Sequence, residues 1–126
     1  MTPALPDALC FLNGEFAALK DARISVLDRG FIFGDGVYEV LPAYGGRIFR
    51  FDQHMARLDR SLDALRINNP HSPAEWLAMA RRLIDALVAS TGAPNQIVYI
   101  QITRGVAPRD HVMPRGLRPT VFVMVS

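Results

Sequence analysis

The residues best suited to chemistry in this sequence lie in a long basic stretch near its C-terminal end. Residues 104–118 hold four arginines and one histidine against a single aspartate. Arg109 and His111 are two positions apart, so their side chains point to the same side of an extended backbone. A guanidinium fork beside an imidazole donor suits a carboxylate or a phosphate. A solvated surface loop is the alternative interpretation, and nucleic acid is disfavoured because no aromatic residue is present to stack on bases.

A second candidate site is formed by His54 and Arg57, which are three positions apart on a predicted helix and therefore share a face. Arg57 falls between Met55 and Leu58, at the border of the apolar stripe of this helix. From that border its guanidinium can reach inward to an anion, or it can lie over the helix surface. A structural role for His54 is equally compatible with the pattern.

The third candidate is the segment from Gly34 to Glu39. Its glycines either let backbone amides approach a ligand or serve as plain turn residues. Tyr38 and Glu39 are neighbours on a predicted strand, so they point to opposite faces, and only one of them can face a given pocket.

Several enzyme signatures are missing from the sequence. It contains no phosphate-binding Walker loop, no dinucleotide fingerprint and no paired-cysteine motif. The histidines at 54, 71 and 111 lack metal-ligand spacing, so no metal is expected. Lys20 is the only lysine and is therefore the one candidate for any chemistry that needs a lysine amine.

The elements that would position these residues follow from the apolar patterns and the turn signals. An Asn-Gly pair and a Gly-Gly pair each separate two apolar runs and predict hairpins. Two amphipathic stretches, one of them opened by a capping box, predict helices. The expected elements are a hairpin over 8–19, a strand over 37–44 turning into 47–51, helices over 52–66 and 72–92, and strands over 96–103 and 119–125. This order predicts an α+β fold in which two helices pack on an antiparallel sheet.

Length and composition fit that fold. The 126 residues are half apolar and 21% charged, which predicts one ordinary domain and excludes a disordered chain. No apolar run is long enough to span a membrane. The single cysteine, Cys10, excludes a disulfide framework and favours a cytoplasmic location. A net charge of +2 favours local anion sites over a broad nucleic-acid surface.

The three candidate sites occur together in one known family. The stretch from Asp28 to Val40, DRGFIFGDGVYEV, resembles the N-terminal block of the class IV, or fold-type IV, pyridoxal-phosphate-dependent aminotransferases. Asn13-Gly14, the helix segment 51–61 and the stretch 101–114 continue the resemblance in the family's order, over nearly the whole chain. The resemblance is strongest to D-amino-acid aminotransferases. Residues 1–126 would then form the small N-terminal domain of such an enzyme.

The resemblance implies a role for each matching residue. Arg57 matches the arginine that binds the phosphate of pyridoxal 5'-phosphate, and Tyr38 matches a tyrosine that faces the substrate. Arg109 and His111 match the Arg-x-His pair that binds the substrate carboxylate in D-amino-acid aminotransferases, where it reaches into the active site of the partner subunit. The expected partners are therefore an amino acid, a 2-oxo acid and a second copy of the protein, with no nucleic acid and no membrane.

One departure from the family concerns its Schiff-base lysine, which lies on a strand beyond the last matching position, in a larger C-terminal domain. Lys20 falls outside every matching motif. We therefore expect the parent protein to be an aminotransferase and the 126-residue chain alone to be inactive. A branched-chain aminotransferase and an aminodeoxychorismate lyase remain alternatives within the family. A non-catalytic dimerisation or ligand-binding module is the alternative outside it.

Overall fold

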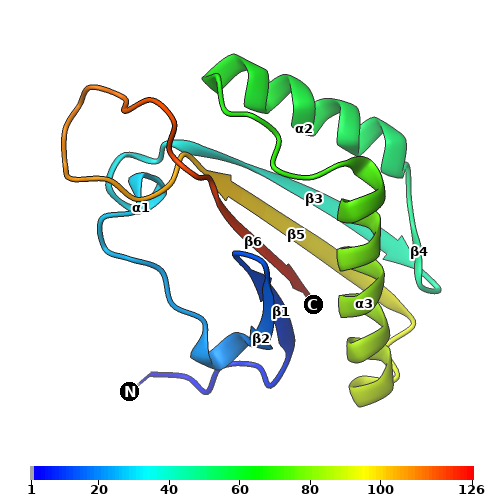
Figure 1. Ribbon diagram of the computed structural model, residues 1–126. Helices are drawn as coiled ribbons and strands as arrows, with labels where there is room; N and C mark the ends of the chain where they lie inside the picture. The colour runs from blue at the N-terminus through cyan, green and yellow to red at the C-terminus, as the bar shows by residue number, and fades with distance from the viewer. Residues whose placement is uncertain (1) are drawn as a thin grey trace.

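Antiparallel pairing joins six strands into one sheet, and two long helices cover one face of it in the computed structural model, which describes residues 2–126 (Figure 1). The strands lie in the order β2-β1-β6-β5-β3-β4. This arrangement confirms the expected α+β fold. The strands are β1 (Leu9–Leu12), β2 (Glu15–Ala18), β3 (Gly36–Tyr44), β4 (Arg47–Ile48), β5 (Asn95–Thr103) and β6 (Thr120–Val125). The helices are η1 (Leu19–Asp21), α1 (Arg29–Phe33), α2 (Phe51–Leu65) and α3 (Pro73–Thr91).

Local sequence signals account for the best-defined elements. Asn13 and Gly14 both have positive φ and form the turn between β1 and β2, as the Asn-Gly pair predicts. The Ser72 hydroxyl accepts from the Glu75 N–H while the Glu75 carboxylate accepts from the Ser72 N–H, so the predicted capping box is present. Gly92 closes α3 in the left-handed conformation.

The start of α2 differs from the sequence prediction. The sequence predicted a helix from residue 52 with Asp52 as its N-cap, but the helix already begins at Phe51, after Arg50 in the left-handed conformation. The chain enters this helix directly from the short strand β4, and the Phe49 N–H donates to the Pro42 carbonyl at 2.8 Å. Asp52 instead lies in the first turn, where its negative charge interacts favourably with the positive end of the helix dipole.

A short helix, α1, also forms just before the predicted turn at Gly34–Gly36, in a stretch for which the sequence predicted no element. The Asp28 carboxylate caps it by accepting from the Gly30 N–H at 2.8 Å, and Gly34 ends it in the left-handed conformation. Gly30 allows close packing, since a Cβ at this position would lie 2.2 Å from the Thr103 side chain. The helix is thereby seated against the end of β5.

The two faces of the sheet have different surroundings. Alternate residues of β3, β5 and β6 pack beneath α2 and α3, with Trp76 of α3 and Leu58 and Leu62 of α2 among the fully buried side chains. The opposite face is covered by neither long helix, and α1 packs only at its end, against Thr103. This face carries a row of rings, in which Tyr38, Tyr99 and Phe122 contact in sequence. Tyr38 thus lies on the open face, and Glu39 on the covered face.

Candidate functional site

The first group of candidate residues is assembled around Glu39, on the face of β3 that α2 covers. Its side chain is only 2% exposed and accepts hydrogen bonds from His54 and Arg57, which lie one turn apart on α2. The His54 Nδ1 is 2.7 Å from Glu39 Oε1, and the Arg57 Nη2 donates to the same oxygen at 2.5 Å. Arg57 Nε also donates to both carboxylate oxygens, at 3.0 and 3.1 Å. The predicted shared face of His54 and Arg57 is therefore confirmed, and its neighbour is Glu39.

These contacts keep Glu39 ionised. Burial alone would raise the pKa of this carboxyl, but the hydrogen bonds and positive charge of Arg57, with those of His54, outweigh burial and hold the pKa below its ordinary value. In return the carboxylate fixes the orientation of the guanidinium, whose side chain is 58% exposed. Arg57 is thus an oriented cation that still reaches solvent.

Arg57 and Tyr38 line one hollow, of about 380 Å³, together with Glu39, Val40 and Ser61. The expectation that only one of Tyr38 and Glu39 could face a given pocket is therefore wrong for this hollow. Nε and Nη2 of Arg57 are engaged by Glu39, whereas Nη1 has no hydrogen-bond partner among residues 2–126. A guanidinium held on one edge and free on the other can still bind an anion, because each of its nitrogens carries its own donors. The sequence had singled out Arg57 and Tyr38 separately, and the structure brings them together.

The second group lies on the segment that joins β5 to β6. The His111 ring has its centroid 5.3 Å from that of Phe33, and the Arg109 guanidinium lies 5.6 Å from the same ring. Both side chains therefore meet one neighbour, although the chain bends at Arg109 and at His111 and does not have the extended backbone that the sequence predicted. Both are exposed. Figure 1 shows this segment, in orange, curling beside α1 at the end of the sheet.

A buried ionic cluster beneath this segment was not recognised from the sequence. The Asp35 carboxylate accepts from Arg29 Nε at 2.8 Å and from Arg104 Nε at 2.7 Å, and all three residues are buried. Burial raises the pKa of Asp35, but the hydrogen bonds from Arg104 and Arg29 more than offset it, so the carboxyl remains ionised.

The backbone amides of the glycine-rich turn at residues 34–36 are bonded within the turn and to α1. The N–H groups of Gly34, Asp35 and Gly36 donate to the carbonyls of Gly30, Arg29 and Gly34, at 2.9 to 3.2 Å. These amides therefore stabilise the turn and are not free to hold a ligand. The interpretation of this segment as turn chemistry holds, and its one strongly polar side chain is used internally.

Lys20 lies in η1, exposed and directly after β2. In the strand order β2-β1-β6-β5-β3-β4, four strand spacings separate β2 from the strand that carries Tyr38. At about 4.8 Å per spacing this is roughly 19 Å across the sheet. Lys20 therefore lies far from the hollow that Arg57 and Tyr38 share.

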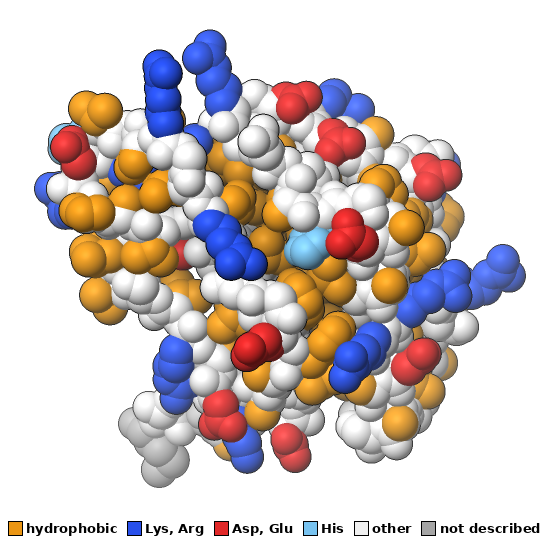
Figure 2. All heavy atoms as spheres, in the orientation of Figure 1, with side chains coloured by type: hydrophobic (Ala, Val, Ile, Leu, Met, Phe, Trp, Pro, Cys, Tyr) orange, Lys and Arg blue, Asp and Glu red, His pale blue; other side chains and the backbone are white. Residues whose placement is uncertain are grey.

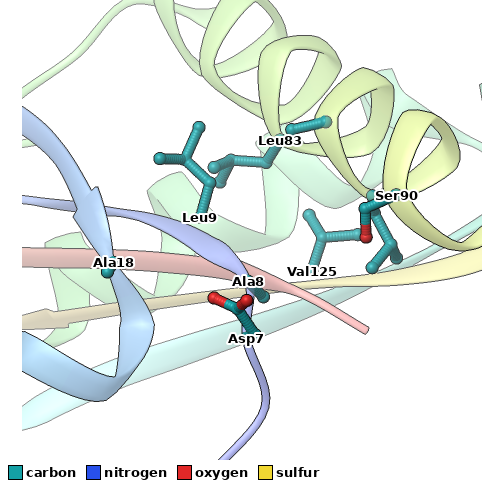
Figure 3. Close-up of a pocket in the computed structure, with 9 residues that line it drawn as sticks. Asp7, Ala8, Leu9, Ala18, Leu83, Ser90 and Val125 are labelled. Carbon is teal, nitrogen blue, oxygen red and sulfur yellow. The ribbon is translucent and has the colours of Figure 1, made fainter.

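Another hollow, of about 330 Å³, lies beside α3 (Figure 3). Its other wall is formed by the start of β1 and by the ends of β2 and β6. Its lining is largely alanine, leucine and valine, and Asp7 and Ser90 supply its polar side chains. With one acidic group and no basic one, this lining is unsuited to an anion. The hollow beside β3, in which the exposed charged group is the Arg57 guanidinium, is the better candidate site.

The face of the molecule in Figure 2 carries no broad basic surface. In Figure 2 the lysine and arginine side chains are scattered over that face between acidic ones and do not form a continuous stripe. Over residues 2–126, every helix is too short or too polar to cross a bilayer.

Comparisons with known proteins identify the family of this chain. A sequence profile described as amino-transferase class IV matches residues 36–126, which contain Glu39, Arg57 and the segment with Arg109 and His111. The chain therefore belongs to the class IV aminotransferase family, as its sequence resemblance indicated.

Within that family, the chain is 41% identical over 104 residues to D-alanine aminotransferase from Staphylococcus aureus, covering 82% of this chain and 36% of that protein. The branched-chain amino acid aminotransferase from Escherichia coli shares the fold with a TM-score of 0.82 at 21% identity, over 96% of this chain and 41% of that one. The 4-amino-4-deoxychorismate lyase from Pseudomonas aeruginosa is similar with a TM-score of 0.73 at 27% identity, over 94% of this chain and 39% of that one. The chain thus spans less than half the length of the relatives that it matches.

Proposed function

We propose that this chain is the N-terminal domain of a pyridoxal-phosphate-dependent aminotransferase, which transfers an amino group between a D-amino acid and a 2-oxo acid. The observation that carries the proposal is the Arg57 guanidinium, oriented by the buried Glu39 and facing the same hollow as Tyr38. The similarity to D-alanine aminotransferase supports the choice of a D-amino acid.

The residues present fit the phosphate of this cofactor. Glu39 neutralises part of the charge on Arg57, but His54 adds a second donor on the same carboxylate, and the Nη1 edge of Arg57 remains available among the described residues. We propose that Arg57 binds the phosphate through this edge. When bound, the cofactor supplies the electron sink that amino transfer needs.

The other two tasks fall to Tyr38 and to the pair formed by Arg109 and His111. Tyr38 is 65% exposed on the open face of the sheet, where its hydroxyl would orient a substrate group. Arg109 supplies a planar fork of donors and His111 a further one, which together suit a substrate carboxylate. We propose that this pair acts in the site of the partner subunit of a cytoplasmic homodimer.

This chain does not contain the lysine that the reaction needs. Lys20, its only lysine, is remote from Tyr38 and Arg57 and matches no family motif. We propose that the reactive lysine belongs to a larger second domain of the parent enzyme. In that domain the lysine would hold and move the substrate proton. The 126-residue chain alone is accordingly expected to be inactive.

Two other activities have specific support. The fold is shared with a branched-chain aminotransferase and with an aminodeoxychorismate lyase, so either could be carried out on this scaffold. The Arg-x-His pair at 109 and 111 favours the D-amino-acid enzyme over both. A non-catalytic binding or dimerisation module would retain the fold and lack the reaction altogether.

The proposal is tested by the donor profile of the longer protein that contains this chain. We expect D-alanine and D-glutamate to be consumed with 2-oxoglutarate or pyruvate as acceptor, at rates far above those of L-leucine and L-valine. A profile restricted to L-branched-chain donors would reassign the enzyme, and pyruvate release from aminodeoxychorismate would identify the lyase. If the reading frame ended at Ser126 and the product bound no cofactor, the non-catalytic module would be the better description.

A further inference from the structure

The Arg109–His111 pair lies in the middle of a long connection, residues 104–119, between β5 and β6. Both side chains are exposed, and an exposed loop of this length has no intrinsic reason to keep one geometry. A pair that binds a carboxylate must nevertheless be presented in a fixed arrangement. Contacts from elsewhere in the fold must therefore supply the rigidity.

The start of the connection is fastened to the segment around α1. The Arg104 N–H donates to the Asp35 carbonyl at 3.0 Å, and its side chain donates to the Asp35 carboxylate at 2.7 Å and to the Leu65 carbonyl at 2.6 Å. The Gly105 carbonyl accepts from the Arg29 N–H at 2.9 Å.

The two ends of the connection also meet at Gly105. Its φ is +117°, and a Cβ there would lie 2.3 Å from the Arg118 carbonyl oxygen. Only glycine allows this close approach. The connection is therefore a closed loop with a rigid base.

Arg29 fastens the middle of the loop. Its Nη1 donates to the Asp110 carbonyl at 2.7 Å, while its Nε donates to the Asp35 carboxylate at 2.8 Å. Asp110 lies between Arg109 and His111 in the sequence. Because the guanidinium is buried and engaged at both ends, it cannot turn without losing one of these bonds. The backbone between the two candidate residues is thus tied to α1.

Phe33, at the other end of the same short helix, contacts the side chains themselves. Its ring centroid is 5.3 Å from that of His111, and the guanidinium carbons of Arg109 and Arg29 lie 5.6 and 4.7 Å from it. A cation near an aromatic ring is attracted by the electrons of the ring. Phe33 therefore limits the directions that both candidate side chains can take.

We propose that Arg29 and Phe33 are positioning residues, which hold the Arg109–His111 pair in the arrangement that binds a substrate carboxylate and so set the affinity for that group. This inference rests on the proposed function, because it assigns a task to residues that act through the proposed carboxylate site.

A double-mutant cycle in the longer protein tests it, with kcat/KM for D-alanine as the readout. Leu replaces the half-buried ring of Phe33 with a side chain of similar bulk but without its π face. We expect Phe33→Leu to lower kcat/KM roughly fivefold to twentyfold, mainly by raising KM, with cofactor affinity unchanged. In an Arg109→Ala background, Phe33→Leu should lower kcat/KM by less than about twofold, because the guanidinium that Phe33 positions is already absent.

Two further variants complete the test. Arg29→Lys, which keeps the charge but can make only one of the two bonds, should reproduce the rise in KM. Phe31→Leu on the same helix serves as the matched control, since Phe31 is 69% exposed and outside these contacts, and should leave KM unchanged.

The outcomes separate the two proposals. An equal loss from Phe33→Leu in both backgrounds, or no loss in either, would overturn the positioning role while leaving the proposed function intact. If Arg109→Ala itself left kcat/KM for D-alanine unchanged, the carboxylate site would be wrong, and the positioning role would fall with it.

Discussion

At the scale of single residues, the same buried carboxylate explains both the position and the reach of Arg57. Glu39 is nearly inaccessible, so its charge can be kept only by the donors that α2 brings to it. Arg57 satisfies that carboxylate with one edge, and its Nη1 has no hydrogen-bond partner among residues 2–126. His54, which the sequence left without a definite role, is the second donor.

Replacing this guanidinium should weaken cofactor binding in the parent enzyme. We expect Arg57→Ala to raise the Kd for pyridoxal 5'-phosphate by roughly tenfold to 150-fold, the range for loss of a hydrogen bond to a charged group. Titration of the apoenzyme with the cofactor measures it. Arg60→Ala is the matched control, because Arg60 is an exposed arginine of the same helix. The Kd of this variant for pyridoxal 5'-phosphate should equal that of the wild type. Unaltered affinity in both variants would mean that Arg57 only stabilises Glu39.

The second residue-scale prediction concerns the carboxylate pair. Arg109→Ala removes a forked, charged donor, so kcat/KM for a D-amino acid should fall by tens to a few hundredfold, while cofactor affinity stays nearly constant. His111→Ala should act in the same direction. Arg109→Lys should restore only part of the rate, because an ammonium group cannot reproduce the fork.

Arg115 and Arg118 are exposed arginines of the same connection and provide the controls for this series. Their alanine variants should retain nearly full turnover. Comparable losses from all of these arginines would instead show that the connection acts through diffuse positive charge.

At the scale of elements, the cluster of Arg29, Asp35 and Arg104 joins α1, the end of β5 and the connection that follows. Loss of one charge from a buried ionic group leaves the others uncompensated. Asp35→Asn should therefore destabilise the chain by about 3–5 kcal/mol near neutral pH, measured by urea unfolding. Asp85→Asn, an exposed site on α3, should leave the free energy of unfolding nearly unchanged.

The same variant has a defined pH dependence. The pKa of Asp35 lies below its ordinary value of 3.8 in the folded chain, so its ionised form contributes stability above that value. That contribution is lost as the pH falls through the lowered value. The difference in unfolding free energy between the wild type and Asp35→Asn should thus be constant above about pH 5 and shrink in more acidic solution. A difference that grew on acidification would contradict the assigned ion pairs.

These elements also show which parts of the structure can be predicted from the sequence. The first hairpin and α3 were predicted because Asn13-Gly14 and the box at Ser72 and Glu75 encode their geometry over a few residues. Helix α1 was missed because five residues are too few to show a helical period. The ionic cluster could not be found, since Arg104 and Asp35 are separated by 69 positions and meet only in the folded sheet. A charged residue inside an apolar strand, as at Glu39, was the one available signal for a buried pair.

For the whole molecule, the separation between Lys20 and the hollow determines what this chain can do alone. Borohydride reduction fixes any covalent adduct between the cofactor aldehyde and a lysine. We expect no stoichiometric adduct on the 126-residue chain, because its only lysine is remote from Arg57 and Tyr38. Mass spectrometry after reduction and proteolysis gives the answer, with the longer protein as the positive control. A full adduct on Lys20 would mean that this lysine reaches the cofactor.

Mixed dimers can show whether Arg109 and His111 complete the site of their own subunit or of the partner. If they act across the interface, one intact site needs the reactive lysine from one subunit and Arg109 from the other. A dimer of an Arg109→Ala subunit with a subunit lacking the reactive lysine then holds one complete site and one doubly defective site. Random reassociation of equal amounts makes half of the dimers mixed, so activity should recover to about a quarter of the wild-type value per subunit. Each variant alone should stay near its own low rate. If the pair acted within its own subunit, every site would lack either the lysine or the arginine, and mixing would restore nothing.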